Sequence, residues 1–527
     1  MSTMNKLIFT LLLAGAAPAL LAQTVNWATD IAPILYEHCV KCHRDGGIGH
    51  FSLVGYDNAF SRQNSLQYMT ETRQMPPWKA DPNYRHFADE NILTNAQLQT
   101  IKTWVNTGAQ PGNLAQAPAD PVFATGSEIG APDLVLHTPL HTMTATADEY
   151  RCFVIPAGLA QTAYLRGLEV IPGNHEAVHH VLVYEDASGQ ARLLDQQSPG
   201  AGYVSFGGIG VQGAKLVGAW VPGARPRLLP PFMGMKLSAG ADLVLQVHFP
   251  ASAIGKSESS TVNLFFTPTN QGIREVTMAP LLNHTALSLE NGPLNIPPNA
   301  VKTYHATFNV PFTGSLIGVA PHMHLIGRSI ESFGVQPNGD TIPLVRIPEW
   351  DFHWQGTYTF QHVQKIPANT KLHAYATYDN TLNNPNNPSN PPKTVTQGEA
   401  TTDEMMLVYF LYTAYQPGDE NILLDSTLLA TAVPEVPAND RLAGLELSPN
   451  PASGPLTISY TLKQAATVRA SIVDLQGRTL KIFAYRTDAA PGDYRDETTV
   501  QDLPPGIYVV RVEAGGGYLL SKKFIRE

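Results

Sequence analysis

The stretch Ile317-Gly318-Val319-Ala320-Pro321-His322-Met323-His324 decides the fold of the largest part of this chain. It continues a short β run, and His322 and His324 are two residues apart. On a strand both side chains therefore point to one face and can share a metal ion, although a surface pair would look the same. Pro321 favours an edge or a strand end, because proline donates no hydrogen bond to a sheet. We predict a strand that ends in an open pair of metal ligands.

Further soft or borderline metal ligands stand apart in the sequence at His179-His180, His248 and Met405. Adjacent histidines on a regular strand point to opposite faces, so sharing one ion requires a bulge, a strong twist or a strand end. His248 alternates with apolar residues and could equally be a core histidine. Spacing alone therefore leaves both possibilities open. Imidazole suits copper, zinc and iron, and a thioether favours Cu(I), so together these residues would form two unlike copper sites.

The sequence Cys39-Val40-Lys41-Cys42-His43 is typical of covalent attachment of a c-type haem. The thiols add to the haem and His43 binds the iron, whereas a thioredoxin-type redox pair would need a βαβ context that is missing. We expect Met75, held by the turn that Pro76 and Pro77 form, to be the sixth iron ligand. Its rivals are Met69, His50 and His86.

Length and composition set the organisation. With 527 residues, 43% hydrophobic and only 15% charged, the chain predicts several ordered domains, mainly β. The net charge of −10 argues against a nucleic-acid partner. Residues 1–22 read as a secretory signal peptide, and no later segment is apolar enough to span a membrane, so we expect the mature protein not to be integral to one. Two of the three cysteines belong to the haem motif, which leaves Cys152 without a partner.

We predict four domains after the signal peptide. The first is a small α-helical, cytochrome c-like haem domain with helices around Ile31–His43 and Thr94–Gly108, separated by a stretch without periodicity. Two β domains that would carry the copper ligands follow, as sandwiches or barrels, and then a last β-rich unit; a break near Met278–Asn299 divides the first two. The boundaries are residues 23–112, 131–278, 279–430 and 441–527.

Four motifs occur in the order of the copper type II ascorbate-dependent monooxygenases, the family of the peptidylglycine α-hydroxylating and dopamine β-hydroxylating enzymes. They are His179-His180-Val181-Leu182-Val183-Tyr184, Leu245-Gln246-Val247-His248, Pro321-His322-Met323-His324-Leu325-Ile326-Gly327-Arg328 and Thr401-Thr402-Asp403-Glu404-Met405. The resemblance covers Asp133 to Leu428 and implies two β-sandwich domains facing across a solvent-filled cleft.

The resemblance also implies roles for the ligands. His179, His180 and His248 would hold an electron-storing copper. A second copper, which binds O2, would be held by the catalytic residues His322, His324 and Met405.

Tyr409, four residues after the methionine, is retained from the family pattern and is a further candidate catalytic residue. Two positions depart from that pattern: Ala320 replaces the arginine that binds a peptide carboxylate in peptide-amidating members, and Leu407 replaces an asparagine. The family's disulfides are also missing. We therefore expect an uncharged or weakly polar small substrate rather than a glycine-extended peptide.

The C-terminal residues resemble the type IX secretion C-terminal sorting domain of the Bacteroidota, although an ordinary small β-sandwich would also account for them. The motifs are Leu447–Pro451, Ile472–Arg478, Leu503–Tyr508 and Lys522–Phe524. The resemblance implies export to the periplasm, haem attachment there, and passage to the cell surface by the type IX secretion machinery. We expect removal of the domain near Val433–Asp440.

The sequence as a whole predicts a secreted or cell-surface monooxygenase that hydroxylates an activated C–H bond with O2. Its cofactors would be two copper ions, one covalently bound haem c, and a reductant such as ascorbate or an electron-donor protein. Two alternatives remain: a copper-binding or electron-transfer surface protein without oxygenase activity, and an adhesin with vestigial motifs.

Overall fold

The computed structural model describes residues 25–123, 126–223, 225–424, 442–473, 479–514 and 518–526. The predicted signal peptide and the predicted linker Val433–Asp440 lie outside these residues. The chain divides into two compact units, Met1–Thr427 and Leu428–Glu527. None of the helices in the described ranges combines the length and the apolar composition that crossing a membrane requires.

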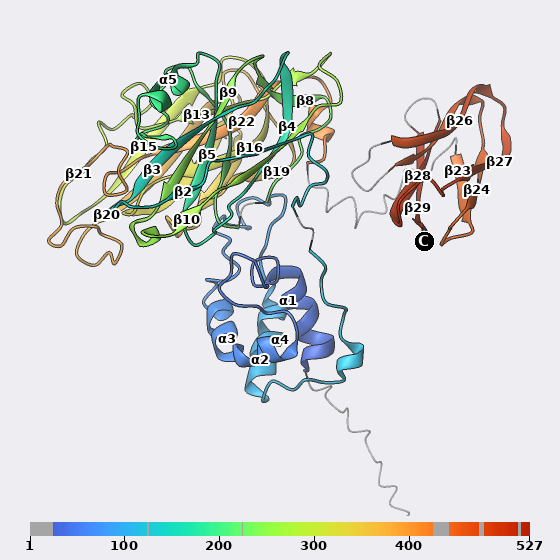
Figure 1. The fold of residues 1–527 in the computed structure, drawn as a ribbon, viewed down its shortest axis with the longest axis horizontal. Coiled ribbons are helices and arrows are strands. Elements are labelled where there is room, and N and C mark those ends of the chain that lie inside the picture. Colours follow the sequence, from blue (N-terminus) through green and yellow to red (C-terminus); the bar gives the residue numbers. More distant parts are fainter. Residues whose placement is uncertain are drawn as a thin grey trace, which may run out of the picture. The chain divides into compact units, whose positions relative to one another are not determined.

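The helices gather near the N-terminus (Figure 1). They are a π-helical turn Trp27–Ile31, α1 Ala32–His38, α2 Tyr56–Ser61, α3 Gln63–Glu71 and α4 Asn95–Asn106. The start of α4 is as predicted, because Thr94 caps it in a reciprocal capping box with Gln97. The helices α2 and α3 were not predicted. They bury only Ala59, Leu66 and Thr70, too few apolar positions for a periodic signal.

The first β-sandwich consists of two five-stranded sheets. One has the order β1-β11-β4-β8-β12, with bounds Leu134–His137, Thr261–Phe266, Ala163–Ile171, Met233–Leu237 and Arg274–Glu275. The other has the order β6-β3-β9-β5-β7, with bounds Tyr203–Val204, Glu149–Pro156, Asp242–Phe249, His180–Asp186 and Lys215–Trp220. A short helix, α5 Gln190–Gln196, and a strand pair, β2 His141–Thr142 with β10 Ser257–Glu258, accompany them. Central strand β9 is buried along its whole length, which places the core between the sheets.

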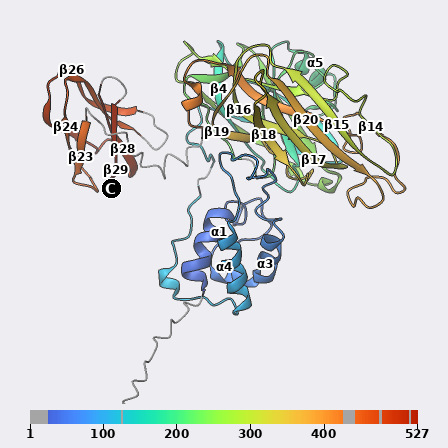
Figure 2. The same ribbon diagram turned by 180° about the vertical axis from the view of Figure 1, so that it is seen from behind.

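The second β-sandwich consists of two four-stranded sheets, seen from behind in Figure 2. One has the order β13-β22-β16-β19, with bounds Thr277–Leu282, Leu407–Ala414, Gly314–His322 and Tyr358–Ile366. The other has the order β15-β20-β17-β18, with bounds Ala300–Asn309, Lys371–Asn380, Gly327–Val335 and Thr341–Ile347. The short strands β14 Asn295–Ile296 and β21 Val395–Thr396 pair with each other.

Strand β13 lies inside the predicted break Met278–Asn299, so regular structure of the second sandwich begins there. Pro280 interrupts the sequence pattern that is typical of a β-strand, so the strand was not predicted. The structure accommodates this proline by placing β13 at a sheet edge with a register shift between Pro280 and Leu282.

The second compact unit is a β-sandwich of its own. Its sheets have the orders β23-β24-β27 and β26-β25-β28-β29. The bounds from β23 to β29 are Leu442–Ser448, Pro455–Leu462, Ala466–Val473, Thr479–Ala489, Gly492–Thr499, Gly506–Ala514 and Tyr518–Arg526.

A segment inside the predicted haem domain packs into the second β-sandwich. Phe87 is 1% exposed, forms a bridge with Phe360 of β19 and stacks on its ring at 5.8 Å. Asp81 accepts a hydrogen bond of 2.7 Å from Arg346 of β18, and Arg85 donates to the carbonyl of Pro343 at 2.6 Å. The chain between α3 and α4 is therefore part of the β-sandwich core.

This packing predicts that Phe87→Ala destabilises the second β-sandwich, although Phe87 lies in the predicted haem domain along the sequence. Removing a buried phenylalanine costs about 3–5 kcal/mol. We expect faster amide hydrogen exchange in β19 and β22, while Phe60→Ala, at a position 42% exposed in α2, should leave both strands unchanged. Equal exchange in the two variants would show that Phe87 contributes nothing to the sandwich.

Candidate functional site

The three histidines of the first set meet where β5 begins. His180 is the first residue of β5 and lies opposite His248 of β9 in the antiparallel register. His179 precedes the strand, and its backbone N–H donates to the carbonyl of His248 at 2.9 Å. A strand end therefore allows adjacent histidines to face one point, one of the three arrangements that the sequence left open.

Their ring nitrogens converge. The Nδ1 atom of His179 lies 3.2 Å from Nδ1 of His180 and 3.2 Å from Nδ1 of His248. Two imidazole nitrogens about 2.0–2.1 Å from a common ion, and roughly tetrahedral to it, stand about 3.3 Å apart. The spacing of the set therefore fits one metal ion, and the three residues form a group that could hold one.

Electrostatics keep these rings in the form that binds metal. Burial and the neighbouring His248 lower the pKa of His179 to about 4, and burial lowers the pKa of His180 well below its usual value. Asp148 accepts a hydrogen bond of 3.1 Å from Nε2 of His248, and that bond lowers the pKa of the carboxyl group. The proton of His248 thus sits on Nε2, which leaves its Nδ1 lone pair for the ion.

The second pair ends β16 as predicted, with His322 as the last strand residue. Nδ1 of His322 donates to Oε1 of Gln355 at 2.5 Å, and Nδ1 of His324 donates to the carbonyl of Asp403 at 3.1 Å. Because both partners are oxygen acceptors, the lone pairs are left on Nε2. Burial lowers the pKa of His322 to about 3 and of His324 to about 4, so both rings are neutral at physiological pH.

Glu404 connects this pair to Met405. It is fully buried, and its carboxylate accepts N–H bonds from His324 at 2.9 Å, Ile326 at 2.8 Å and Met405 at 3.2 Å. Burial raises the pKa of Glu404 to about 8 against the opposing effect of these donors. The hydroxyl of Tyr378 also donates to the Met405 carbonyl at 2.8 Å. One carboxylate thus fixes both segments that contribute to the second set.

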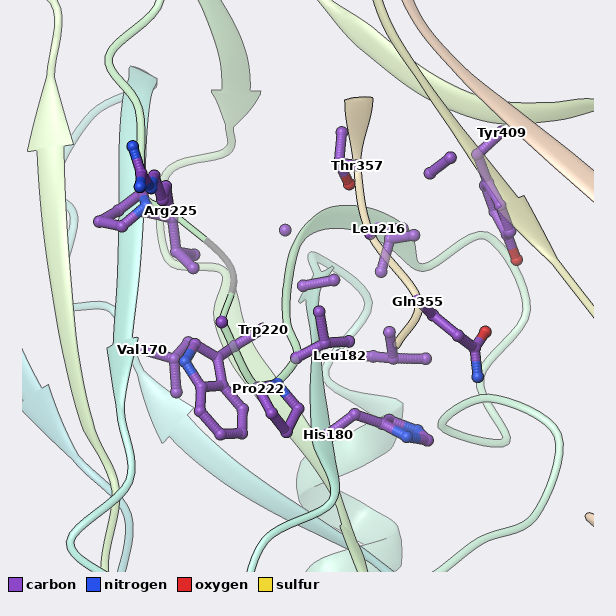
Figure 3. Close-up of a pocket in the computed structure, with 18 of the residues that line it drawn as sticks. Val170, His180, Leu182, Leu216, Trp220, Pro222, Arg225, Gln355, Thr357 and Tyr409 are labelled. Carbon is purple, nitrogen blue, oxygen red and sulfur yellow. The ribbon is translucent and has the colours of Figure 1, made fainter. Parts of the chain in front are cut away.

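A cavity of about 1140 Å³ joins the two sets, with walls from both sandwiches. It is lined by Tyr409 and by five of the six candidate copper ligands, His179, His180, His322, His324 and Met405. Figure 3 shows His180, Gln355 and Tyr409 on one side of the view and Val170, Trp220 and Arg225 on the other.

The haem motif opens on the same cavity. Backbone N–H bonds from Cys42 and His43 to the carbonyl of Cys39, at 3.1 and 3.0 Å, continue α1 as a helical turn. Residues at i, i+3 and i+4 of such a turn share one face, which is the arrangement that haem attachment needs. Cys39 and Cys42 are free thiols, and Cys42 lines the cavity. These residues fit a c-type haem.

The remaining sequence-predicted residues are placed as follows. Met75 is half-buried and lies two and three residues before Pro77 and Trp78, which line the cavity. Cys152 is a free thiol with no exposed surface, packed with Tyr203 and Val244, as expected for a small apolar residue.

Sequence reasoning did not assign a function to Asp148, Glu404, Phe352 or Gln355. Glu404 lies in a quoted motif beside Met405, so its position was a usable signal. Gln355 stands 33 residues from its histidine partner, and Asp148 stands 100 residues from its own, so no local pattern connects them.

The contacts of Glu404 predict that Glu404→Gln weakens copper binding at the second set and spares the first. The amide keeps one acceptor oxygen and turns its NH2 group toward N–H donors, at a cost of about 1–3 kcal/mol for each buried group left unpaired. Metal analysis of the purified variant should show one copper lost. Glu185→Gln, at a buried glutamate that accepts the Ser238 N–H, is the matched control and should retain both. Full copper content in Glu404→Gln would contradict this role.

Two segments of the chain match known families. Residues 299–423 match the copper type II ascorbate-dependent monooxygenase, C-terminal domain. Residues 446–527 match the secretion system C-terminal sorting domain. The motifs around His179 and His248 and the haem motif lie outside both matches. A comparison with curated proteins finds no match.

Similarity to solved structures is weak. A β-glucuronidase from Faecalibacterium prausnitzii is 13% identical with a TM-score of 0.13, over 43% of this chain and 37% of that one. A GH2 β-galacturonidase from Eisenbergiella tayi is 10% identical with a TM-score of 0.14, over 47% and 42%. A peptide-N(4)-(N-acetyl-β-D-glucosaminyl) asparagine amidase is 8% identical with a TM-score of 0.21, over 54% and 97%. The chain spans less than half of the first two structures, and such scores carry no argument.

The family matches agree with the resemblance that the sequence motifs indicated for the second sandwich and the C-terminal unit. The chain therefore carries the C-terminal domain of the copper type II ascorbate-dependent monooxygenase family, followed by a secretion-system sorting domain.

Proposed function

We propose that the protein is a secreted dicopper monooxygenase that hydroxylates an activated C–H bond of a small organic substrate. The balanced reaction is R–H + O2 + 2 e⁻ + 2 H⁺ → R–OH + H2O. The observation that carries the proposal is that ligands from both imidazole sets line one cavity, with the free nitrogens of His322 and His324 fixed by their hydrogen bonds. The family match of residues 299–423 supports copper as the metal and ascorbate as a reductant.

The two sets differ in ways that suit different tasks. Copper bound at both supplies the O2 coordination and the electrons that hydroxylation needs. His322 and His324 offer Nε2 atoms at a strand end on the cavity, and the thioether of Met405 favours the reduced metal that meets O2. His179, His180 and His248 offer nitrogen ligands alone, which suits storage of an electron.

The cavity wall near the second set supports an uncharged or weakly polar substrate. Ala320 and Tyr409 are register partners at this point, and Leu407 lies opposite His322. The apolar side chains of Leu182 and Leu216 face the same space (Figure 3). No cation among these residues would hold a substrate carboxylate, so selective turnover of glycine-extended peptides would refute this part of the proposal.

A c-type haem on Cys39, Cys42 and His43, with Met75 as the sixth ligand, is proposed to feed electrons to the copper pair. Cys42 lines the cavity that also contains the copper ligands. Lys79, a few residues after Met75, forms an ion pair of 3.2 Å with Asp351, which belongs to the loop beside the second set. The haem would act with ascorbate or in its place, and would accept electrons from an electron-donor protein.

The sorting domain supports a secreted or surface location. We propose that the type IX secretion machinery recognises residues 441–527 after export to the periplasm and delivers the protein to the cell surface. The compact β-sandwich of this unit, with its own buried core, is consistent with a separate signal domain.

The proposed activity predicts two coppers and one iron per chain in protein made by a host that attaches haem. Reductant and O2 should then oxidise a substrate from a panel of small molecules with activated C–H bonds. His322→Ala should remove one copper and abolish turnover. His373→Ala, which breaks a histidine pair on β15 and β20 outside the cavity, should change neither. Iron without copper would reject the enzyme, and two coppers without turnover across the panel would favour the copper-binding or electron-carrying surface protein.

The haem proposal predicts that His43→Ala loses turnover supported by a reduced protein donor and keeps turnover supported by ascorbate. His86 is exposed and pairs with Glu90. His86→Ala should keep both activities and the haem spectrum, because Met75 rather than His86 binds the iron. Donor-supported turnover that survives His43→Ala would contradict electron delivery through the haem.

A further inference from the structure

One aromatic ring contacts both metal-ligand sets. Phe352 stacks on the ring of His179, with centroids 5.3 Å apart and an interplanar angle of 19°. The same phenylalanine meets His324 edge to face, at 5.9 Å and 86°. It is only 9% exposed. The family resemblance implied a solvent-filled cleft between the sets, and here a mostly buried side chain on the wall of the cavity also contacts one ligand of each set.

The loop that carries Phe352 is fixed by hydrogen bonds to residues of the second set and within the loop itself. The indole N–H of Trp350 donates to the carbonyl of His324 at 3.2 Å. The amide of Gln355, whose oxygen accepts from His322, donates to the carbonyl of Phe352 at 2.9 Å. Phe352 therefore cannot leave its place without disturbing the backbone or the side chains that hold the second set.

We propose that Phe352 is a positioning residue that holds the two sets at a fixed separation, so that they act as one electron-transfer unit. This inference rests on the proposed function. Copper held by the two sets would supply one electron from each, and with two protons these would complete the reduction of O2 to the product hydroxyl and water.

A fixed contact between the two sets matters because the same two electrons can otherwise reduce O2 without forming product. If O2 receives two electrons and two protons without attacking substrate, the product is H2O2. Excluding water from an active site suppresses such side reactions, and holding the partners in one geometry avoids a loss of rate. The ring of Phe352 supplies a fixed, apolar contact between His179 and His324.

The test compares Phe352→Leu, which keeps apolar volume and removes the ring, with Phe352→Tyr, which keeps the ring. Phe333→Leu is the matched control: Phe333 also stacks on a histidine, His373, at 5.1 Å, on an outer sheet of the same sandwich. All variants are full-length, loaded with copper and checked for two coppers per chain.

Two readouts are used, and the first does not depend on substrate turnover. The first is the distance between the two Cu(II) ions by pulsed electron paramagnetic resonance, which should lengthen or broaden in Phe352→Leu alone. The second is the rate at which copper at the three-histidine set is oxidised when the reduced protein meets O2 and substrate in a single turnover. It should fall about 10- to 100-fold in Phe352→Leu, and stay near wild type in Phe352→Tyr and Phe333→Leu.

In steady state, the ratio of H2O2 released to product formed should rise in Phe352→Leu and remain low in the other variants. Unchanged copper distance, electron-transfer rate and peroxide ratio in a Phe352→Leu protein with both coppers would overturn this inference while leaving the monooxygenase intact. A wild-type protein that binds two coppers and oxidises no substrate would instead reject the proposed function, and the distance measurement would still decide whether Phe352 joins the sets.

Discussion

The candidate metal centre depends on oxygen atoms that determine which ring nitrogen is free in three of its imidazoles, those of His248, His322 and His324. Asp148 holds the Nε2 proton of His248, so this ring presents Nδ1, the atom that lies 3.2 Å from Nδ1 of His179. Gln355 and the carbonyl of Asp403 hold the Nδ1 protons of the second pair, so that set presents Nε2. Without these acceptors a buried neutral imidazole could place its proton on either nitrogen, and the ligand geometry would not be defined.

Local sequence was enough for the features that are decided within a strand or a helical turn. The helix start at Thr94 and the β run that ends at His322 are of this kind, whereas at His179 the sequence left a bulge, a strong twist or a strand end open. The packing of Phe87 on Phe360 and the bond from His322 to Gln355 join residues that meet only in the folded chain. Local patterns contain no signal for such contacts, so the sequence predicted the ligands but not the groups that orient them.

The loop between β18 and β19 brings three parts of the first unit together. Asp351 pairs with Lys79 from the segment that follows α3, Trp350 and Gln355 hold the second ligand set, and Phe352 reaches His179 of the first. These interactions lie within six consecutive residues. A displacement at any of them is transmitted to the others, because their backbone positions are coupled. The geometry of the two sets is thus tied to the segment that connects the helices to the second sandwich.

The ring of Phe352 is buried between His179 and His324, so the cavity is the remaining route to the candidate metal centre. The two ends of this cavity differ in chemistry. Near the haem motif the charged wall residues are paired, Lys41 with Glu128 and Arg227 with Asp89. Near Tyr409 the wall is mainly aliphatic and aromatic. Desolvating an anionic substrate at that end would carry a cost, because the ionisable side chain that interacts with Tyr409 there is the acidic Glu399. The same cavity can therefore admit a weakly polar substrate at one end, while the proposed electron source lies at the other end. Neither the substrate nor the electron source has to pass between the two ligand sets.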